Sequence, residues 1–306
     1  MGISVKILGS NSAAPAHRRN QTSQLINVEG RLHLIDCGEG TQLQMKRFHI
    51  RAQRINNIFI SHLHGDHYLG LMGLLSTMHL LGRKKPLKLY GPKGLAEIIT
   101  LQLKYSETVF NYEVEFHTVD TQVHRVVHED DFIRVHSIPL NHRIPCSGYL
   151  FEEKPKKRRI IKEMLPPDFS VRNIVRLKNG EDIEDEEGNI AYENTKYTHP
   201  PKKSFKYAYC SDTKYDESIL PYIQGVDMLY HESTFLDEQA ERAANTFHST
   251  AKEAATIAKK AGAGRLLLGH FSIRYKELEP LKEEARTVFE NSDLAIEGED
   301  YVLGNS

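Results

Sequence analysis

Four side chains of the kinds that bind metal ions are crowded into one short segment of the chain. They are His62, His64, Asp66 and His67. Residues 56–61 before them have the pattern of a buried strand, and residues 68–82 after them that of a largely buried helix. A single histidine after an apolar strand is usually a core or surface residue, but crowding four such groups here is costly without a partner. Because Gly65 lets the backbone turn, the pairs on either side of it could serve two separate metal ions.

Three further candidate ligands each follow an apolar, strand-like run: His142, Asp212 and His270. Taken singly, Asp212 could cap a helix and the two histidines could lie on the surface. Taken with the first four, they complete a set of five histidines and two aspartates. Imidazole and carboxylate donors without thiolates suit two Zn²⁺ ions, with Mn²⁺ or Co²⁺ as substitutes.

Composition excludes several classes of protein. The 306 residues carry a net charge of −1, so a nucleic acid would have to be bound by a local basic patch. The three scattered cysteines argue against a disulfide framework and for a reducing, cytoplasmic environment. No apolar run reaches the roughly 18 residues of a membrane span. The N-terminus resembles a strand, without the features of a signal peptide.

The hydrophobic pattern predicts a β-rich fold with helices between the strands and no internal repeat. The predicted strands are residues 3–9, 22–28, 32–37, 56–61, 86–90, 206–210, 226–231 and 265–269, with three or four more between 112 and 151. The predicted helices are residues 40–49, 68–82, 93–105, 237–245, 250–261 and 276–290. This order favours a β-sandwich with helices on its outer faces.

Residues 153–205 differ in character from the rest. The segment begins with a basic run from Lys154 to Lys162, contains two Pro-Pro pairs, and carries the acidic run 181–187. Little of it has the periodicity of a core. A segment of this length inside a domain is usually functional or disordered. We therefore expect one domain, 1–306, with a protruding arm inserted at 153–205.

The motifs together resemble those of a known family. The block HLHGDH with the later His142, Asp212 and His270 resembles the metallo-β-lactamase superfamily. The stretches PLNHRIPCSGYLFEE, YCSDTKYDESI, FHSTAKEAATIAKKAGAGRLLLGHFSIRY and PAHRRNQTS are similar to those of ribonuclease Z, the endonuclease that trims the 3′ end of precursor tRNA. The resemblance covers most of the chain outside the arm. It implies an αββα sandwich, a homodimer and precursor tRNA as the partner.

The resemblance also implies a role for each matching residue. His62, His64 and His142 would hold one metal ion, Asp66, His67 and His270 the other, and Asp212 would bridge the two ions. Asp66 would also accept a proton from the attacking water, His248 would assist at the leaving group or the phosphate, and Glu232 would orient His248.

Residues that would contact RNA are implied in two places. Arg19 and Asn20 match a motif that contacts the RNA end, although His17 stands where a lysine is common. In the arm, which in this family grips the tRNA elbow, the basic residues are Lys156, Lys157, Arg158 and Arg159. The Gly-Pro-rich motif of many such arms is not evident here.

The expected chemistry is two-metal phosphodiester hydrolysis. Two ions about 3.5–4 Å apart share a water and lower its pKa, which predicts a tRNA 3′-hydroxyl and a trailer 5′-phosphate. Three alternatives remain open: a hydrolase of the same fold acting on small phosphodiesters or aryl sulfates, a thioester or lactam hydrolase, and a metal-dependent RNA-binding module without catalysis. Aspartate in place of cysteine at 212 counts against a β-lactamase.

Overall fold

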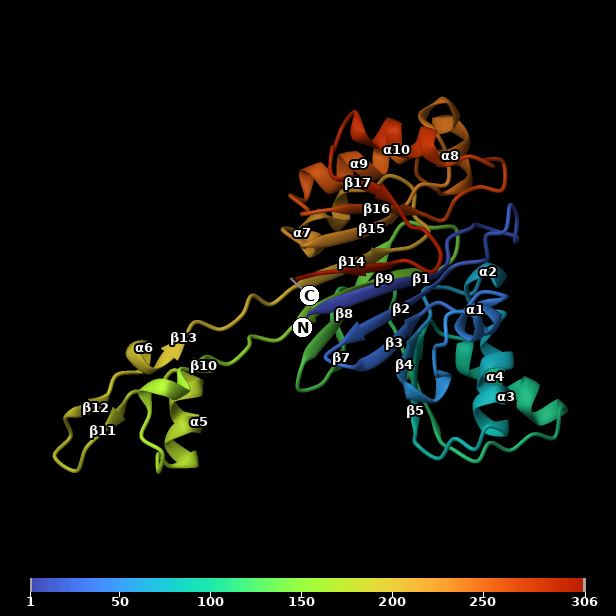
Figure 1. Ribbon diagram of the computed structural model, residues 1–306. Helices are drawn as coiled ribbons and strands as arrows, with labels where there is room; N and C mark the ends of the chain where they lie inside the picture. The colour runs from blue at the N-terminus through green and yellow to red at the C-terminus, as the bar shows by residue number, and fades with distance from the viewer. Residues whose placement is uncertain (1, 305–306) are drawn as a thin grey trace. The chain divides into compact units, whose positions relative to one another are not determined.

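The computed structural model describes residues 2–304 and divides the chain into two compact units (Figure 1). One unit runs up to Glu153 and resumes at Phe205. The other is Lys154–Ser204, which lies within the predicted arm and is called the arm below.

Two seven-stranded sheets form the first unit. The first sheet has the order β18 (Asp300–Val302), β1 (Ile3–Gly9), β2 (Ser23–Val28), β3 (Arg31–Ile35), β4 (Ile55–Phe59), β5 (Leu87–Gly91), β6 (Val114–Thr118). The second has the order β17 (Ser292–Leu294), β16 (Leu266–Gly269), β15 (Met228–Glu232), β14 (Lys206–Cys210), β9 (Cys146–Glu153), β8 (Ile133–Leu140), β7 (Val126–Glu129).

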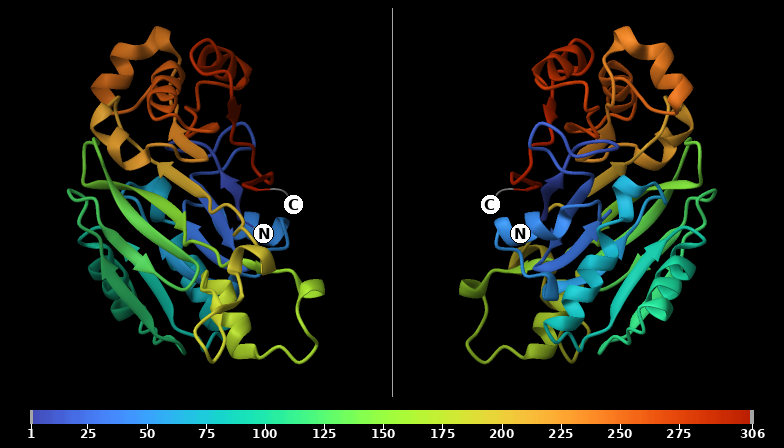
Figure 2. Two further views of the ribbon diagram at one scale, coloured as in Figure 1. Left: turned by 90° about the vertical axis from the view of Figure 1, so that its left-hand side faces the viewer. Right: turned by 90° about the vertical axis from the view of Figure 1, so that its right-hand side faces the viewer.

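Helices flank both sheets, as the views in Figures 1 and 2 show. The helices of this unit are α1 (Thr41–Arg47), α2 (Gly65–Tyr68), α3 (Leu71–Leu80), α4 (Leu95–Tyr105), α7 (Leu220–Ile223), α8 (Ala240–Thr246), α9 (Ala251–Lys260) and α10 (Glu279–Arg286). Its short 3₁₀ turns are η1 (Ala52–Arg54), η3 (Glu217–Ile219) and η4 (Asp237–Gln239).

Strand alternation explains why the layers stack in this order. Successive side chains of a strand point to opposite faces, so a strand buried on both faces contributes to two cores. In β4, Ile58 packs with the helical side of the first sheet and Phe59 with the interior between the sheets. In β14, Tyr209 faces that same interior while Ala208 packs against the α9 side. The three cores make four layers, and the predicted sandwich with outer helices is confirmed.

The loops that follow several strands bring the candidate ligands to one edge of the sandwich. The segment containing His62 follows β4, His142 follows β8, Asp212 follows β14 and His270 follows β16. Because β14, β15 and β16 run parallel, their carboxyl ends meet at the same edge. Residues far apart in sequence can therefore share one site.

The helix predicted at residues 68–82 is divided in the structure. Helix α2 ends at Tyr68, and α3 begins at Leu71 after Gly70. A Cβ atom at Gly70 would lie 2.2 Å from the backbone oxygen of Gly38, so the chain approaches too closely there for any side chain. The break brings α2, which carries Asp66 and His67, close to the turn after β3.

The arm has a small fold of its own. Its elements are β10 (Arg159–Ile160), η2 (Lys162–Met164), α5 (Val171–Asn179), β11 (Ile183–Glu184), β12 (Ile190–Tyr192), α6 (Asn194–Tyr197) and β13 (Thr198–His199). Ser170 caps α5 by accepting from the backbone N–H of Asn173, and Gly180 ends it in a left-handed conformation. Leu177 and Ile183 are buried, so this segment has apolar contacts that its polar sequence did not indicate.

Candidate metal centre and active site

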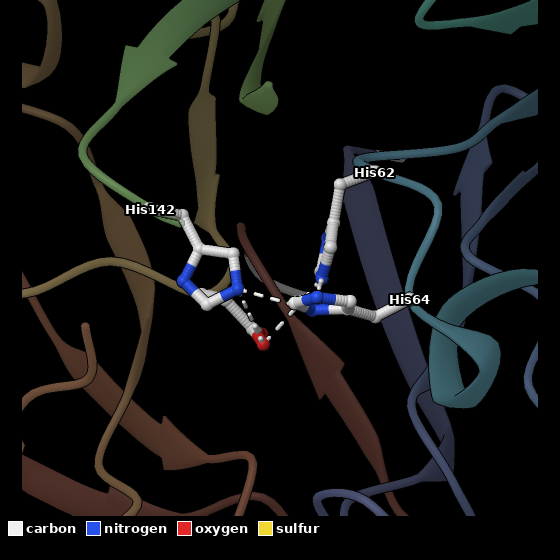
Figure 3. Close-up of side chains that lie close together, drawn as sticks. His62, His64 and His142 are labelled. Atoms are coloured by element: carbon white, nitrogen blue, oxygen red, sulfur yellow. Dashed lines mark hydrogen bonds and ion pairs between the residues drawn. The ribbon is translucent and has the colours of Figure 1, made fainter. Parts of the chain in front are cut away.

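The first group of candidate ligands is His62, His64 and His142, whose ring nitrogens converge (Figure 3). His62 Nε2 and His142 Nε2 each lie 3.1 Å from His64 Nδ1. His62 is fully buried, and Ser61 Oγ lies 2.9 Å from its Nδ1. The other ring nitrogen of His142 faces the carbonyl oxygen of Phe247 at 3.0 Å, which leaves Nε2 directed into the group.

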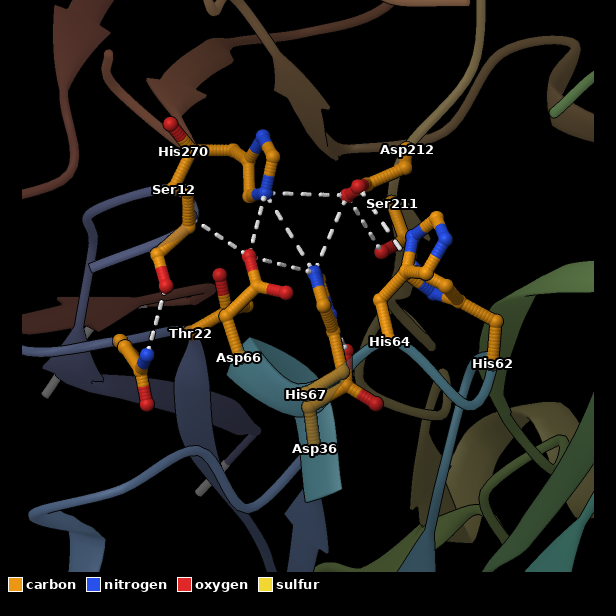
Figure 4. A network of polar contacts seen from close by, with 12 residues as sticks. Ser12, Thr22, Asp36, His62, His64, Asp66, His67, Ser211, Asp212 and His270 are labelled. Atoms are coloured by element: carbon orange, nitrogen blue, oxygen red, sulfur yellow. Dashed lines mark hydrogen bonds and ion pairs between the residues drawn. The ribbon is translucent and has the colours of Figure 1, made fainter. Parts of the chain in front are cut away.

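The second group is Asp66, His67 and His270 (Figure 4). His67 Nε2 and His270 Nε2 lie 3.3 Å apart, and each is 3.5 Å from Asp66 Oδ2. Both histidines are buried. His270 adopts a left-handed backbone conformation with φ 58°, which is uncommon for a residue other than glycine and requires support from its surroundings.

Asp212 lies between the two groups and presents one oxygen to each. Its Oδ1 is 3.2 Å from both His67 Nε2 and His270 Nε2. Its Oδ2 is 3.5 Å from His62 Nε2 and 3.8 Å from His142 Nε2. The side chain is buried and belongs to the loop that follows β14. One carboxylate thus faces both sets of nitrogens, as a bridging ligand must.

The chemistry of these donors fits a bound cation. Several imidazole nitrogens face one another at hydrogen-bond distance, where lone pairs repel unless a proton or metal ion lies between them. Within residues 2–304, no lysine or arginine pairs with Asp66 or Asp212. Burial alone would lower the pKa of His67, yet Asp212, Asp66 and Asp36 together raise it well above its ordinary value. The centre therefore favours positive charge.

Asp36, which was not predicted from the sequence, supports His67 through the ring nitrogen that faces away from the ligand group. Asp36 Oδ2 accepts from His67 Nδ1 at 2.8 Å and from the Tyr209 hydroxyl at 2.6 Å. Its other oxygen accepts from the backbone N–H of Ser61. A carboxylate on the far nitrogen fixes the tautomer and orientation of a ligating histidine. Asp36 also follows an apolar strand, β3, so the same strand-end signal that indicated Asp212 could have found it.

His248 and Glu232 form a pair beside the centre. His248 Nδ1 lies 2.9 Å from Glu232 Oε1. Burial would lower the pKa of His248, but Glu232 raises it to about 9. Both Glu232 oxygens are also occupied by backbone N–H groups, from Thr213 and Ser249. The pair therefore resembles an imidazole oriented by a fixed carboxylate, with Nε2 left for another partner.

A cavity of about 920 Å³ is lined by members of both ligand groups (His64, His142, Asp66 and His270), by Asp212 and by His248. Three exposed arginines, which the sequence analysis did not single out, also line it: Arg143, Arg242 and Arg274. The Arg143 guanidinium lies 3.3 Å from His64 Nε2, on the outer side of that ring. A cavity lined by histidines and exposed arginines suits an anionic substrate.

The structure places Arg19 and Asn20 in the loop before β2, where their polar atoms already bind the protein. Arg19 donates to the carbonyl oxygens of Tyr275 and Lys276 and to Asn11 Oδ1. Asn20 donates from its side chain and its backbone to Glu297. Their predicted contact with RNA stays a prediction.

The basic residues predicted to bind RNA lie at the start of the arm. Lys157, Arg158 and Arg159 line a hollow of about 640 Å³ within the arm, together with apolar residues that include Phe169. Lys156 is not among the residues that line it. Arg158 also donates to Thr198 Oγ1 at 2.7 Å, so part of its hydrogen-bonding capacity is used inside the arm.

Two relatives that match nearly the full chain are both named ribonuclease Z. Ribonuclease Z of Cytophaga hutchinsonii is 48% identical over 305 residues, covering 100% of this chain and 97% of the relative. Ribonuclease Z of Parabacteroides distasonis is 48% identical over 297 residues, covering 96% and 97%. The chain belongs to the ribonuclease Z family. A family model described as "Anti-Pycsar protein Apyc1" also matches residues 3–152.

Solved structures agree with this family and this fold. Human tRNase Z, short form, is 28% identical with a TM-score of 0.70, covering 99% of this chain and 100% of that chain. The metallo-β-lactamase fold protein YhfI of Bacillus subtilis, at 19% identity and a TM-score of 0.69 over 98% of this chain and 99% of that one, shows the fold alone. Among residues 2–304, none of the helices has the length and apolar character needed to cross a membrane.

Proposed function

We propose that this member of the ribonuclease Z family is a metal-dependent endoribonuclease that removes the 3′ trailer from precursor tRNA. The observation that carries the proposal is Asp212, which faces one nitrogen-rich group with each of its oxygens, beside the His248–Glu232 pair. Full-length relatives named ribonuclease Z support the choice of substrate.

The proposed cofactors are two Zn²⁺ ions per subunit, with Mn²⁺ or Co²⁺ as substitutes. His62, His64 and His142 would hold one ion, Asp66, His67 and His270 the other, and Asp212 would contact both. Nitrogen and carboxylate donors in this ratio suit zinc. When bound, the two ions would lower the pKa of a water nucleophile and offset negative charge on the phosphoryl oxygens.

The protein's own residues would manage the protons. The Asp66 carboxylate, held by the backbone N–H of Ala13 at Oδ2, would accept a proton from the attacking water. The bond from phosphorus to the tRNA 3′ oxygen would break, and His248 Nε2 would give a proton to that oxygen. The products would be a tRNA 3′-hydroxyl and a trailer 5′-phosphate. Glu232 would keep His248 oriented and protonated.

The arm would supply affinity for tRNA. Its basic residues, Lys156, Lys157, Arg158 and Arg159, would contact phosphates and release counterions. We further propose a homodimer in the cytoplasm; sedimentation of the purified protein at several concentrations tests the dimer.

One experiment tests the function directly. Zinc-loaded protein is incubated with precursor tRNAs that carry or lack an encoded CCA, and both product ends are mapped. We expect cleavage near the mature 3′ end with the ends stated above. A 2′,3′-cyclic phosphate on the tRNA would contradict the mechanism, because it requires attack by the 2′-hydroxyl and not by water.

Two further assays separate this function from two of its alternatives. A small aryl phosphodiester turned over efficiently while precursor tRNA is not would favour the small-substrate hydrolase. Binding of precursor tRNA without cleavage under any divalent metal would favour a binding module.

A further inference from the structure

The N-terminal loop, residues 10–22 between β1 and β2, contacts the second ligand group directly. The backbone N–H of Ala13 donates to Asp66 Oδ2 at 2.7 Å. Ala13 has a left-handed conformation, with φ 56°, and its carbonyl accepts from the side chain of Gln21 at 2.7 Å. The position of this N–H, and with it the direction of the Asp66 carboxylate, therefore depends on the conformation of the loop.

The same loop also fixes the backbone at His270. Phe271 donates its N–H to the carbonyl of Ser10 at 2.9 Å, and its own carbonyl accepts from the Ser12 N–H at 2.9 Å. These bonds lie one residue beyond His270, whose φ of 58° needs such support. Two of the three residues of this ligand group thus depend on the loop.

Arg19 ties the loop to the segment that follows His270. Its guanidinium donates to the carbonyl oxygens of Tyr275 and Lys276, and its Nε donates to Asn11 Oδ1 at 3.0 Å. His17 Nε2 contacts the same segment, 2.9 Å from the Ile273 carbonyl oxygen. On the other side, Glu297 accepts from the Asn20 backbone at 2.6 Å and side chain at 2.8 Å. The donors of Arg19 are thus directed at the protein's own carbonyls.

We propose that Arg19 is a positioning residue for the Asp66–His67–His270 group, which it holds in place through the N-terminal loop, and that it does not contact an RNA phosphate. This inference rests on the metal site of the proposed function. A planar guanidinium spans three acceptors in fixed directions, which the single ammonium of lysine cannot reproduce. Shape, and not charge alone, is therefore what the position requires.

The test compares Arg19→Ala and Arg19→Lys with Arg18→Ala, which removes the same charge from the neighbouring, exposed position. Each zinc-loaded protein is dialysed against graded free Zn²⁺ set by a chelator, and the ions retained per chain are counted. Thermal unfolding confirms that each variant is folded. At saturating Zn²⁺, the slope of log kcat/KM for precursor tRNA against log salt is then measured.

We expect both Arg19 variants to lose one ion at free Zn²⁺ concentrations 10–100-fold higher than do the wild type and Arg18→Ala, as for other groups that orient metal ligands. Their salt slopes should equal that of the wild type, and their loss should fall on kcat more than on KM. Should Arg19→Ala fail to fold, Arg19→Lys, which keeps the charge, decides the question.

The proposal is overturned if both variants retain two ions as the wild type does, or if Arg19→Lys behaves as the wild type in every measurement. For Arg19→Ala, which removes the charge, a salt slope reduced by about one phosphate contact would likewise show that Arg19 binds RNA. The ion count does not require cleavage. Absence of tRNA cleavage by the wild type would therefore reject the proposed function while the positioning role is still measured.

Discussion

Asp212 is the residue on which the proposed dinuclear character of the centre depends. Because one of its oxygens faces each ligand group, Asp212→Asn should reduce the affinity for both ions. His64→Ala should weaken only the group it belongs to. We expect Asp212→Asn to lower cleavage by more than about 10³-fold, since an amide in its place removes the negative charge shared by both ions. Metal counts by atomic emission check this, with the exposed Asp120→Asn as the matched carboxylate-to-amide control.

The His248–Glu232 pair gives a second prediction at the scale of single residues. His248→Ala should reduce kcat by about 10²–10⁴-fold, the usual contribution of a proton-transfer group. Glu232→Gln should have a smaller effect in the same direction, because the neutral amide no longer favours the protonated imidazole. Neither change should alter the number of bound ions. Loss of an ion from Glu232→Gln would instead make Glu232 a ligand, since it also lies near Asp212 and His270.

At the scale of elements, the strands and the clustering of the candidate metal ligands could be predicted because their signals are local. An apolar run followed by a polar donor marks a strand end, and this rule indicated His142, Asp212 and His270. The close approach of Gly38 to Gly70, where the helix is broken, could not be predicted, because Gly38 belongs to another part of the chain. The two backbone carbonyls that accept from Arg19 could not be predicted either, since they lie 256 and 257 residues away in the sequence.

A buried polar network between the sheets gives a prediction about pH. Asn57 on β4 lies 2.9 Å from His33 Nδ1 and 3.1 Å from His128 Nε2. Burial first, and His128 and Arg31 in addition, lower the pKa of His33 to about 3, while Asp130 opposes them. The unfolded chain therefore binds a proton at His33 below about pH 6.5 that the folded chain does not bind until about pH 3.

The stability of the folded protein should accordingly fall as the pH is lowered through this range. Each pH unit costs about 1.4 kcal/mol, so His33 accounts for about 2 kcal/mol between pH 6.5 and 5. In His33→Phe this part of the acid sensitivity should be absent. Urea midpoints at pH 7 and pH 5 measure the difference, with the exposed His117→Phe as the matched control. Equal acid sensitivity in His33→Phe and the wild type would contradict the prediction.

At the scale of the whole molecule, the arm can be removed without breaking the sheet. Strand β9 ends at Glu153 and β14 begins at Lys206; the two strands are antiparallel, and the Glu153 N–H donates to the Phe205 carbonyl at 2.9 Å. An Asn-Gly pair in place of residues 154–204 would join them as a two-residue hairpin. We expect this variant to fold and to retain its ions, because the seven candidate ligands lie outside the arm.

The activity of the variant without the arm should depend on the substrate. For precursor tRNA we expect kcat/KM to fall by about 100-fold or more, because the proposed phosphate contacts of the arm would supply affinity that the metal centre lacks. Turnover of a small aryl phosphodiester should stay within a few-fold of the wild type. A full-length variant with Lys156, Lys157, Arg158 and Arg159 changed to glutamine separates charge from shape: it should show the tRNA defect and a shallower salt dependence. Equal losses on both substrates would mean that the arm supports the catalytic unit itself, and precursor tRNA would then have to be recognised by the arginines around the cavity.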